Sequence, residues 1–110
     1  MGSHEPLVVR VGERAQSDIQ EIWRWNALQY GADHADAYID LLLVAINSLG
    51  DNADSGSLVP EGDGSRYLIV KKDWSRSAHG HVVVYETTQQ FVNVLRVYHT
   101  AQDWQSHLKN

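Results

Sequence analysis

The chain has 110 residues, of which 43% are hydrophobic and none is cysteine, and its formal net charge is −5. This length suits a single hydrophobic core, and the lack of cysteine excludes disulfides, zinc–thiolate sites and thiol nucleophiles. The negative net charge argues against nucleic acid as the principal partner, because proteins that bind the phosphate groups of nucleic acids usually have a basic surface. We therefore expect a cytoplasmic protein with no cofactor or metal and no sequence-specific nucleic-acid binding of its own.

The domain organisation is predicted to be simple. Residues 1–5 are polar and typical of a cloning remnant, so we expect a remnant or a disordered start there. Residues 6–110 are expected to form one domain. The longest apolar run, Leu41–Ile46, is far shorter than the roughly 20 residues that cross a bilayer, so no membrane partner is expected.

The first half of the chain predicts one strand and two helices. Residues 7–11 are rich in valine and favour a strand. A helix is predicted from residue 15 to Gly31, and a second one from a cap at Asp33 to a stop at Gly50. Apolar residues recur at helical spacing in the first at Ala15, Ile19, Ile22, Trp23, Ala27 and Tyr30, and in the second at Ala35, Tyr38, Ile39, Leu42, Leu43, Ile46 and Leu49. The short join predicts an antiparallel helical hairpin.

The second half of the chain predicts a loop and three strands. Residues 51–65 contain most of the turn-forming residues and no periodicity. The strands are expected at residues 66–71, 79–87 and 90–99, and the last two are close enough to form a β-hairpin. The order β-α-α-β-β-β predicts an α+β fold in which the helical hairpin packs on a small antiparallel sheet.

Three stretches in this order show a family resemblance. Residues 15–23 read Ala-Gln-Ser-Asp-Ile-Gln-Glu-Ile-Trp, and Gly31 precedes Ala-Asp-Ala-Tyr-Ile-Asp at 35–40. The third stretch joins His-Gly-His-Val-Val-Val-Tyr at 79–85 to Val-Leu-Arg-Val-Tyr-His at 94–99, with Asp103 after it. Together they resemble the ParE branch of the RelE/ParE superfamily, whose members are toxins of type II toxin–antitoxin systems.

The resemblance implies a RelE/ParE-like fold and a toxin that has a cognate antitoxin as its partner. Members of the ParE branch poison DNA gyrase and are neutralised by an antitoxin that wraps its C-terminal segment along the toxin. Members of the RelE branch instead cleave mRNA on the ribosome. The favoured hypothesis is therefore a non-enzymatic gyrase inhibitor, the runner-up is an mRNA endoribonuclease, and the third possibility is an inactive or partner-binding family member.

The nuclease hypothesis needs cations for the scissile phosphate and a Tyr or His for proton transfer, without a metal. The candidates of these types in the strands and at their ends are taken to be Arg66, Lys71, Lys72, Arg96 and His99. The runner-up nuclease would use Arg66, Arg96 and His99. Thr100 stands where one nuclease subgroup has Tyr, which favours gyrase inhibition over RNA cleavage.

Structural roles are predicted for several polar residues. Arg96 and His99 are expected to be polar anchors at the edge of the core, with Asp103 accepting a hydrogen bond from one of them. His79 and His81 would share one face of a strand, but they lack a third zinc ligand and are expected to face solvent. Solvated helix faces are also expected for the acidic residues Asp18, Glu21, Asp36 and Asp40.

The large aromatic side chains are expected to be divided between the core and the surface. Trp23 falls on the apolar helical stripe and is expected to be buried, whereas Tyr85 is expected at the rim of the core. Trp25, Trp74 and Trp104 are expected to be exposed or covered by a partner.

The C-terminal end is a candidate for contact with the target. Trp104 and Leu108 are four residues apart, which places both on one face of a short terminal helix. The resemblance implies that this end contributes to action on the target.

Overall fold

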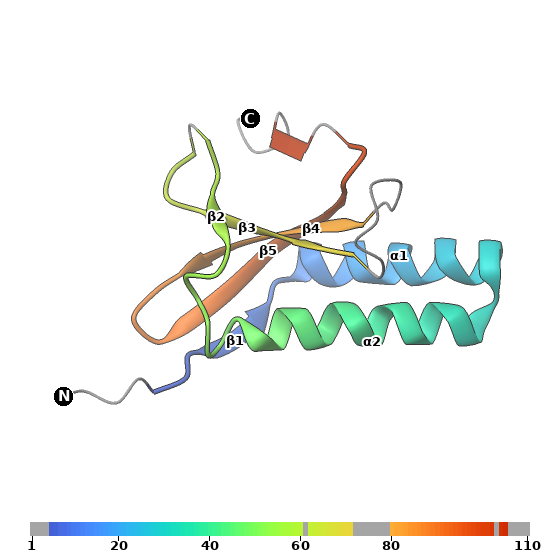
Figure 1. Cartoon of the computed structure of the whole chain (residues 1–110), viewed down its shortest axis with the longest axis horizontal. Coiled ribbons are helices and arrows are strands. Elements are labelled where there is room, and N and C mark those ends of the chain that lie inside the picture. The colour runs from blue at the N-terminus through green and yellow to red at the C-terminus, as the bar shows by residue number, and fades with distance from the viewer. Residues whose placement is uncertain (1–4, 61, 72–79, 103, 106–110) are drawn as a thin grey trace.

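The computed structural model describes residues 5–60, 62–71, 80–102 and 104–105. Two antiparallel helices lie side by side against one face of a twisted sheet (Figure 1). The elements in chain order are β1 (Val8–Val11), α1 (Glu13–Tyr30), α2 (Ala32–Ser48), β2 (Ser57–Leu58), β3 (Arg66–Val70), β4 (His81–Thr87) and β5 (Phe91–His99). The α+β class and the positions of the predicted strands and helices are confirmed.

The sheet is mixed, which corrects the expectation of a wholly antiparallel one. Its strand order is β1-β5-β4-β3-β2, and β1 runs parallel to β5 with Val8 opposite Phe91 and Val11 opposite Val94. The strands β3, β4 and β5 form the antiparallel meander that the sequence predicted. The direction of β1 could not be predicted, because its partner strand lies some eighty residues away along the chain.

The two-residue strand β2 lies inside the predicted loop and pairs with β3. The loop approaches the sheet closely at Gly56, where an added Cβ would lie 2.5 Å from the hydroxyl of Tyr85 and 2.7 Å from the carbonyl oxygen of Tyr67. A side chain at this position would therefore push the loop away from the sheet.

The hairpin join depends on Gly31. This residue has a φ of 97°, which L side chains rarely adopt, and its N–H donates to the carbonyl oxygen of Ala27. It also serves as the N-cap of α2, which begins at Ala32 without a side-chain cap. The prediction that Asp33 caps α2 is wrong, because Asp33 lies in the first helical turn, where its charge interacts with the helix dipole.

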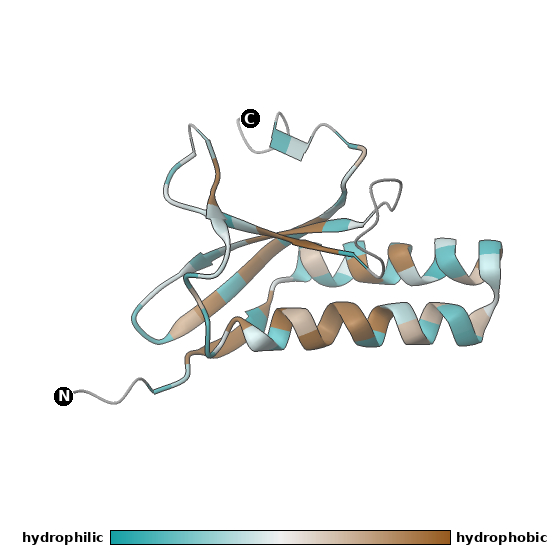
Figure 2. Cartoon of the chain, in the orientation of Figure 1, coloured by the Kyte–Doolittle hydropathy of each residue, from teal (hydrophilic) through white to brown (hydrophobic). Residues whose placement is uncertain are grey.

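The core has two parts, one on each face of the sheet. The larger part joins the helices to the sheet and includes Ala15, Leu42, Ile46, Leu49, Val83, Tyr85, Val92, Val94 and Val97. Strongly hydrophobic residues line α2, β1 and much of the sheet in Figure 2. The smaller part lies on the opposite face and comprises Val59, Val82, Val84, Tyr98 and Trp104, with Tyr67 and Leu95 partly buried against it. The alternation of Val82, Val83 and Val84 between the two parts follows from the two-residue period of a strand.

Tyr85 is fully buried, so its predicted place at the rim is wrong. Its hydroxyl donates to the carbonyl oxygen of Ala53 at 2.8 Å and accepts from the N–H of Gly56 at 3.0 Å. The loop segment that contains Ala53 and Gly56 lies against Tyr85 and helps to remove this side chain from solvent.

Trp23 is 37% exposed, so the prediction that it is buried is also wrong. Its position on α1 faces α2 rather than the sheet, and its indole N–H donates to Asp36 at 2.8 Å. Trp25 is exposed, as predicted, and Trp74 lies outside the described residues. None of the described helices is long and apolar enough to cross a membrane.

Candidate functional site

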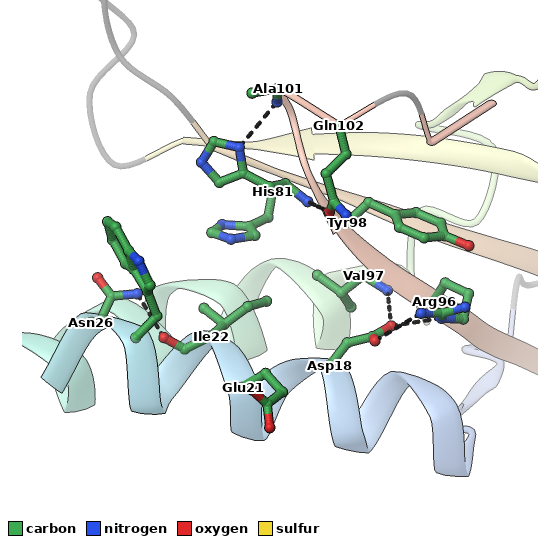
Figure 3. A pocket seen from close by; sticks show the side chains of 12 residues that line it. Asp18, Glu21, Ile22, Asn26, His81, Arg96, Val97, Tyr98, Ala101 and Gln102 are labelled. Carbon is green, nitrogen blue, oxygen red and sulfur yellow. Dashed lines mark hydrogen bonds and ion pairs between the residues drawn. The ribbon is translucent and has the colours of Figure 1, made fainter. Parts of the chain in front are cut away.

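The candidate site is a groove of about 550 Å³ between α1 and the C-terminal half of β5 (Figure 3). It forms because β1 covers the outer edge of β5 only as far as Val94, after which the chain turns at Gly12 into α1. The helix therefore flanks the rest of this edge. The groove is lined by Asp18, Glu21, Ile22, Trp25 and Asn26 of α1, by His81 of β4, and by Arg96, Val97, Tyr98, His99, Ala101 and Gln102.

One end of the groove is closed by an ion pair between α1 and β5. Arg96 donates to Asp18 twice, from Nε to Oδ2 at 2.8 Å and from Nη2 to Oδ1 at 3.0 Å. The backbone N–H of Val97 also donates to Oδ2, at 2.8 Å. Asp18 thus occupies the place that a neighbouring strand would take at the edge of β5. The hydrogen bonding of Arg96 to the Asp18 carboxylate is the main cause that raises the pKa of Arg96, and it keeps the guanidinium charged.

This contact corrects the prediction that Asp18 belongs to a solvated helix face. Asp18 is three residues after Ala15 and four before Ile22, so it lies on the side of α1 that packs against the sheet. That spacing was the signal available in the sequence. Glu21 is solvated as expected and pairs with Arg24 at 2.6 Å.

The other end of the groove contains two histidines from paired positions of β4 and β5, His81 and His99. Their rings meet edge to face with centroids 5.3 Å apart. His81 is buried, which corrects the prediction that it faces solvent, and its Nδ1 lies 2.5 Å from the hydroxyl of Tyr38. Burial, followed by repulsion from His99, lowers the pKa of His81 to about 4, and burial raises the pKa of Tyr38 to about 12. Tyr38 therefore keeps its proton at neutral pH, and its hydroxyl forms a hydrogen bond with Nδ1 of a neutral His81.

His99 is held by the turn that follows β5. The N–H of Ala101 donates to Nδ1 of His99 at 3.0 Å, and the backbone N–H of His99 donates to Oε1 of Gln102 at 2.8 Å. Because Nδ1 accepts a hydrogen bond, the proton of a neutral His99 ring is on Nε2. His79 lies outside the described residues, and the described ones include no group of three or more potential metal ligands.

Arg96 and His99 of the nuclease hypothesis line the same groove, at its two ends, but Arg66 lies outside it. Arg66 lies opposite Tyr85 on β4, whereas His99 lies opposite His81. These two positions on β4 are four residues apart, about 13 Å at roughly 3.3 Å per residue, and β4 also separates β3 from β5. Arg66 instead donates to the carbonyl oxygen of Gly56 at 2.8 Å. Lys71 follows β3 at the same end of the sheet as His99, and Lys72 lies outside the described residues.

Trp104 lies in the smaller part of the core, so the prediction that its side chain is exposed for a target is wrong. Its indole packs on the ring of Tyr67, with centroids 4.8 Å apart, and covers the face of the sheet opposite the helices. The sheet face needs this cover because both helices pack on the other side. Asp103 and Leu108 lie outside the described residues, so the predicted roles of both stay predictions.

The comparisons with known proteins agree on the family and the fold. Residues 9–104 match the model of the ParE toxin of type II toxin-antitoxin systems, parDE. A solved structure entitled "Chromosomal ParDE TA system from P. aeruginosa" has a TM-score of 0.71 and 16% sequence identity, and the match covers 87% of this chain and 98% of the other. No curated protein matches the chain. The family model covers most of the chain and confirms the resemblance drawn from the three motifs. The chain therefore belongs to the family of ParE toxins of type II toxin–antitoxin systems.

Proposed function

We propose that this ParE toxin inhibits DNA gyrase by binding to it, without catalysis, and that a cognate antitoxin silences it by filling the groove between α1 and β5. The proposal places the protein in the cytoplasm, where gyrase acts on DNA. Family membership supports the toxin role, and the geometry of the site supports binding over catalysis.

The observation that supports this most directly is the position of Arg96. A nuclease would need a guanidinium free to meet a phosphate, but that of Arg96 donates two hydrogen bonds to Asp18. Releasing it would leave a carboxylate that is largely buried without a counter-ion, which is strongly unfavourable. Arg66 lies at the opposite end of the sheet from His99. The nuclease candidates therefore act better as structural anchors than as a catalytic group.

The groove suits an antitoxin segment because it combines an apolar wall with polar groups that can fix a register. Ile22 and Trp25 supply apolar surface on α1. His99 supplies a polar group from the end of β5, and Gln102 supplies one from the turn after it. An open groove of this size accommodates several side chains of a bound peptide. Covering it would remove an exposed tryptophan from water.

The test is a pair of assays with the purified toxin. We expect inhibition of DNA supercoiling by gyrase, with accumulation of cleaved DNA, and no cleavage of mRNA on translating ribosomes. Addition of the cognate antitoxin should restore supercoiling. RNA cleavage without an effect on gyrase would replace this proposal with the nuclease hypothesis, and a lack of growth arrest on expression would indicate an inactive member.

A second test uses the basic residues after β3. A toxin that acts on ribosomal RNA depends on its cations, whereas inhibition of gyrase by an acidic protein does not. We therefore expect the double substitution Lys71→Ala and Lys72→Ala to leave growth arrest largely intact. Loss of growth arrest in a double variant that still binds its antitoxin would support the nuclease hypothesis.

A further inference from the structure

The end of α1 presents large apolar side chains to solvent. Trp25, Leu28 and Tyr30 are 54%, 79% and 61% exposed, and we call them the hairpin-end cluster. The rings of Trp25 and Tyr30 meet edge to face with centroids 6.0 Å apart, and Tyr30 also contacts the ring of His34. The helical hairpin extends beyond the edge of the sheet at this end, so no described strand covers the cluster (Figure 1). Exposed tryptophan and tyrosine grouped in this way are typical of the energetic centre of a protein–protein interface.

The cluster sits on a rigid support. Trp23 of α1 donates its indole N–H to Asp36 of α2 at 2.8 Å, which ties the helices together close to the join at Gly31. The buried Asn26 donates from its amide to the carbonyl oxygen of Ile22. A partner that binds this surface loses little free energy in ordering it, because its backbone is already fixed.

The charge around the cluster identifies the kind of partner. From residue 15 to residue 50 the sequence has five acidic residues and one basic residue, Arg24. Glu21 pairs with Arg24 and Asp18 pairs with Arg96. The remaining aspartates of α2, Asp33, Asp36 and Asp40, have no cationic partner among the described residues. The hairpin therefore has a negative field, which favours a partner surface rich in Lys and Arg.

We infer that the hairpin-end cluster is the surface by which this toxin docks on its target, and that the target presents a basic surface of the kind that binds DNA. This inference rests on the proposed function, in which the target is gyrase. It assigns the target contact to the hairpin instead of the C-terminal end, where Trp104 is used for core packing.

The position of Trp25 links docking to neutralisation. Trp25 belongs to the hairpin-end cluster and also lines the groove between α1 and β5. An antitoxin segment in the groove covers part of this side chain and approaches the rest of the cluster. Antitoxin and target therefore compete for the toxin, and neutralisation needs no change in the toxin fold.

The experiment measures the affinity of the purified toxin for the gyrase holoenzyme. The double variant Trp25→Ala with Leu28→Ala removes two exposed side chains, and Leu28→Glu changes only the most exposed one. Val44→Ala is the matched control, because Val44 is 69% exposed on α2 and lies outside the cluster. We expect the first two variants to raise Kd at least about tenfold and the control to leave it unchanged.

Two matched double variants test the role of the acidic residues of α2. Asp33→Asn with Asp40→Asn should weaken gyrase binding and reduce its dependence on salt. Asp51→Asn with Asp63→Asn makes the same change in net charge in the loop after the hairpin and should have a smaller effect. Equal effects of the two pairs would show that only the net charge matters and would overturn the docking surface.

The remaining outcomes separate the inference from the proposed function. If the wild-type toxin binds gyrase and both cluster variants bind equally well, the inference is wrong and gyrase inhibition stands. If the wild-type toxin does not bind gyrase, the inference and the proposed function are both wrong. If the cluster variants lose only antitoxin binding, the cluster belongs to the antitoxin interface, and the inference is overturned. A ternary complex of gyrase, toxin and antitoxin would disprove the competition.

Discussion

Asp18 of α1 and Arg96 of β5, which are 78 residues apart in the chain, form an ion pair with two hydrogen bonds, and the same carboxylate accepts the backbone N–H of Val97. The pair joins the helical layer to the sheet at the point where β1 no longer covers β5. It therefore stabilises the fold and closes one end of the candidate groove. It also removes the guanidinium from any reaction at a phosphate.

The substitution Asp18→Asn should destabilise the fold by about 2 kcal/mol, because it leaves the partly buried Arg96 without a counter-ion. The measurement is urea unfolding followed by circular dichroism. The matched control is Glu21→Gln, which removes an exposed ion pair of the same helix and should change stability by less than about 0.5 kcal/mol. Equal stabilities of the two variants would show that the pair with Arg96 contributes little.

Burial of His81 should make the stability depend on pH. Its pKa is lowered from 6.5 to about 4, so between these values the unfolded chain binds a proton that the folded chain does not. This contribution to stability is complete above pH 6.5 and is lost as the pH falls from 6.5 towards 4, with an upper limit of about 3 kcal/mol.

The variant His81→Gln keeps a hydrogen-bonding group for the hydroxyl of Tyr38 but does not titrate. Its stability should vary less between pH 6.5 and 4.5 than that of the wild-type protein. The comparison is a series of urea unfolding curves across this range. Parallel profiles of the two proteins would mean that His81 does not contribute to the pH dependence.

The hydroxyl of Tyr85 should hold the loop of residues 51–65 against the sheet. In Tyr85→Phe the carbonyl oxygen of Ala53 and the N–H of Gly56 lose their partner, which should cost about 1–2 kcal/mol of stability. Tyr30→Phe, at an exposed position, should be neutral. Amide hydrogen exchange should locate the effect in the loop, and unchanged protection of Gly56 would contradict this role.

Trp104 and the residues after it are predicted to have separable roles. A truncation after Gln102 removes Trp104 from the smaller part of the core and should cost about 3 kcal/mol, whereas a truncation after Gln105 keeps it. Circular dichroism and tryptophan fluorescence measure the first effect. Growth arrest by the longer truncation tests whether Leu108 acts on the target, and equal stability of both truncations would show that Trp104 is dispensable for folding.

The sequence by itself determined the order and extent of the helices and main strands, because each depends on a local period or on a glycine such as Gly31. It also determined the family, since the motifs of residues 15–40 and 79–103 depend only on residue types in order. The tertiary structure decided the environment of individual side chains. Tyr85 and Trp104 are buried by segments from other parts of the chain, and Trp23 is exposed because its side of α1 faces α2 and not the sheet. The ion pair of Arg96 with Asp18 could not be predicted from the sequence for the same physical reason. Periodicity determines which face of a helix or strand is apolar, whereas a contact between elements that are distant in sequence depends on how those faces pack.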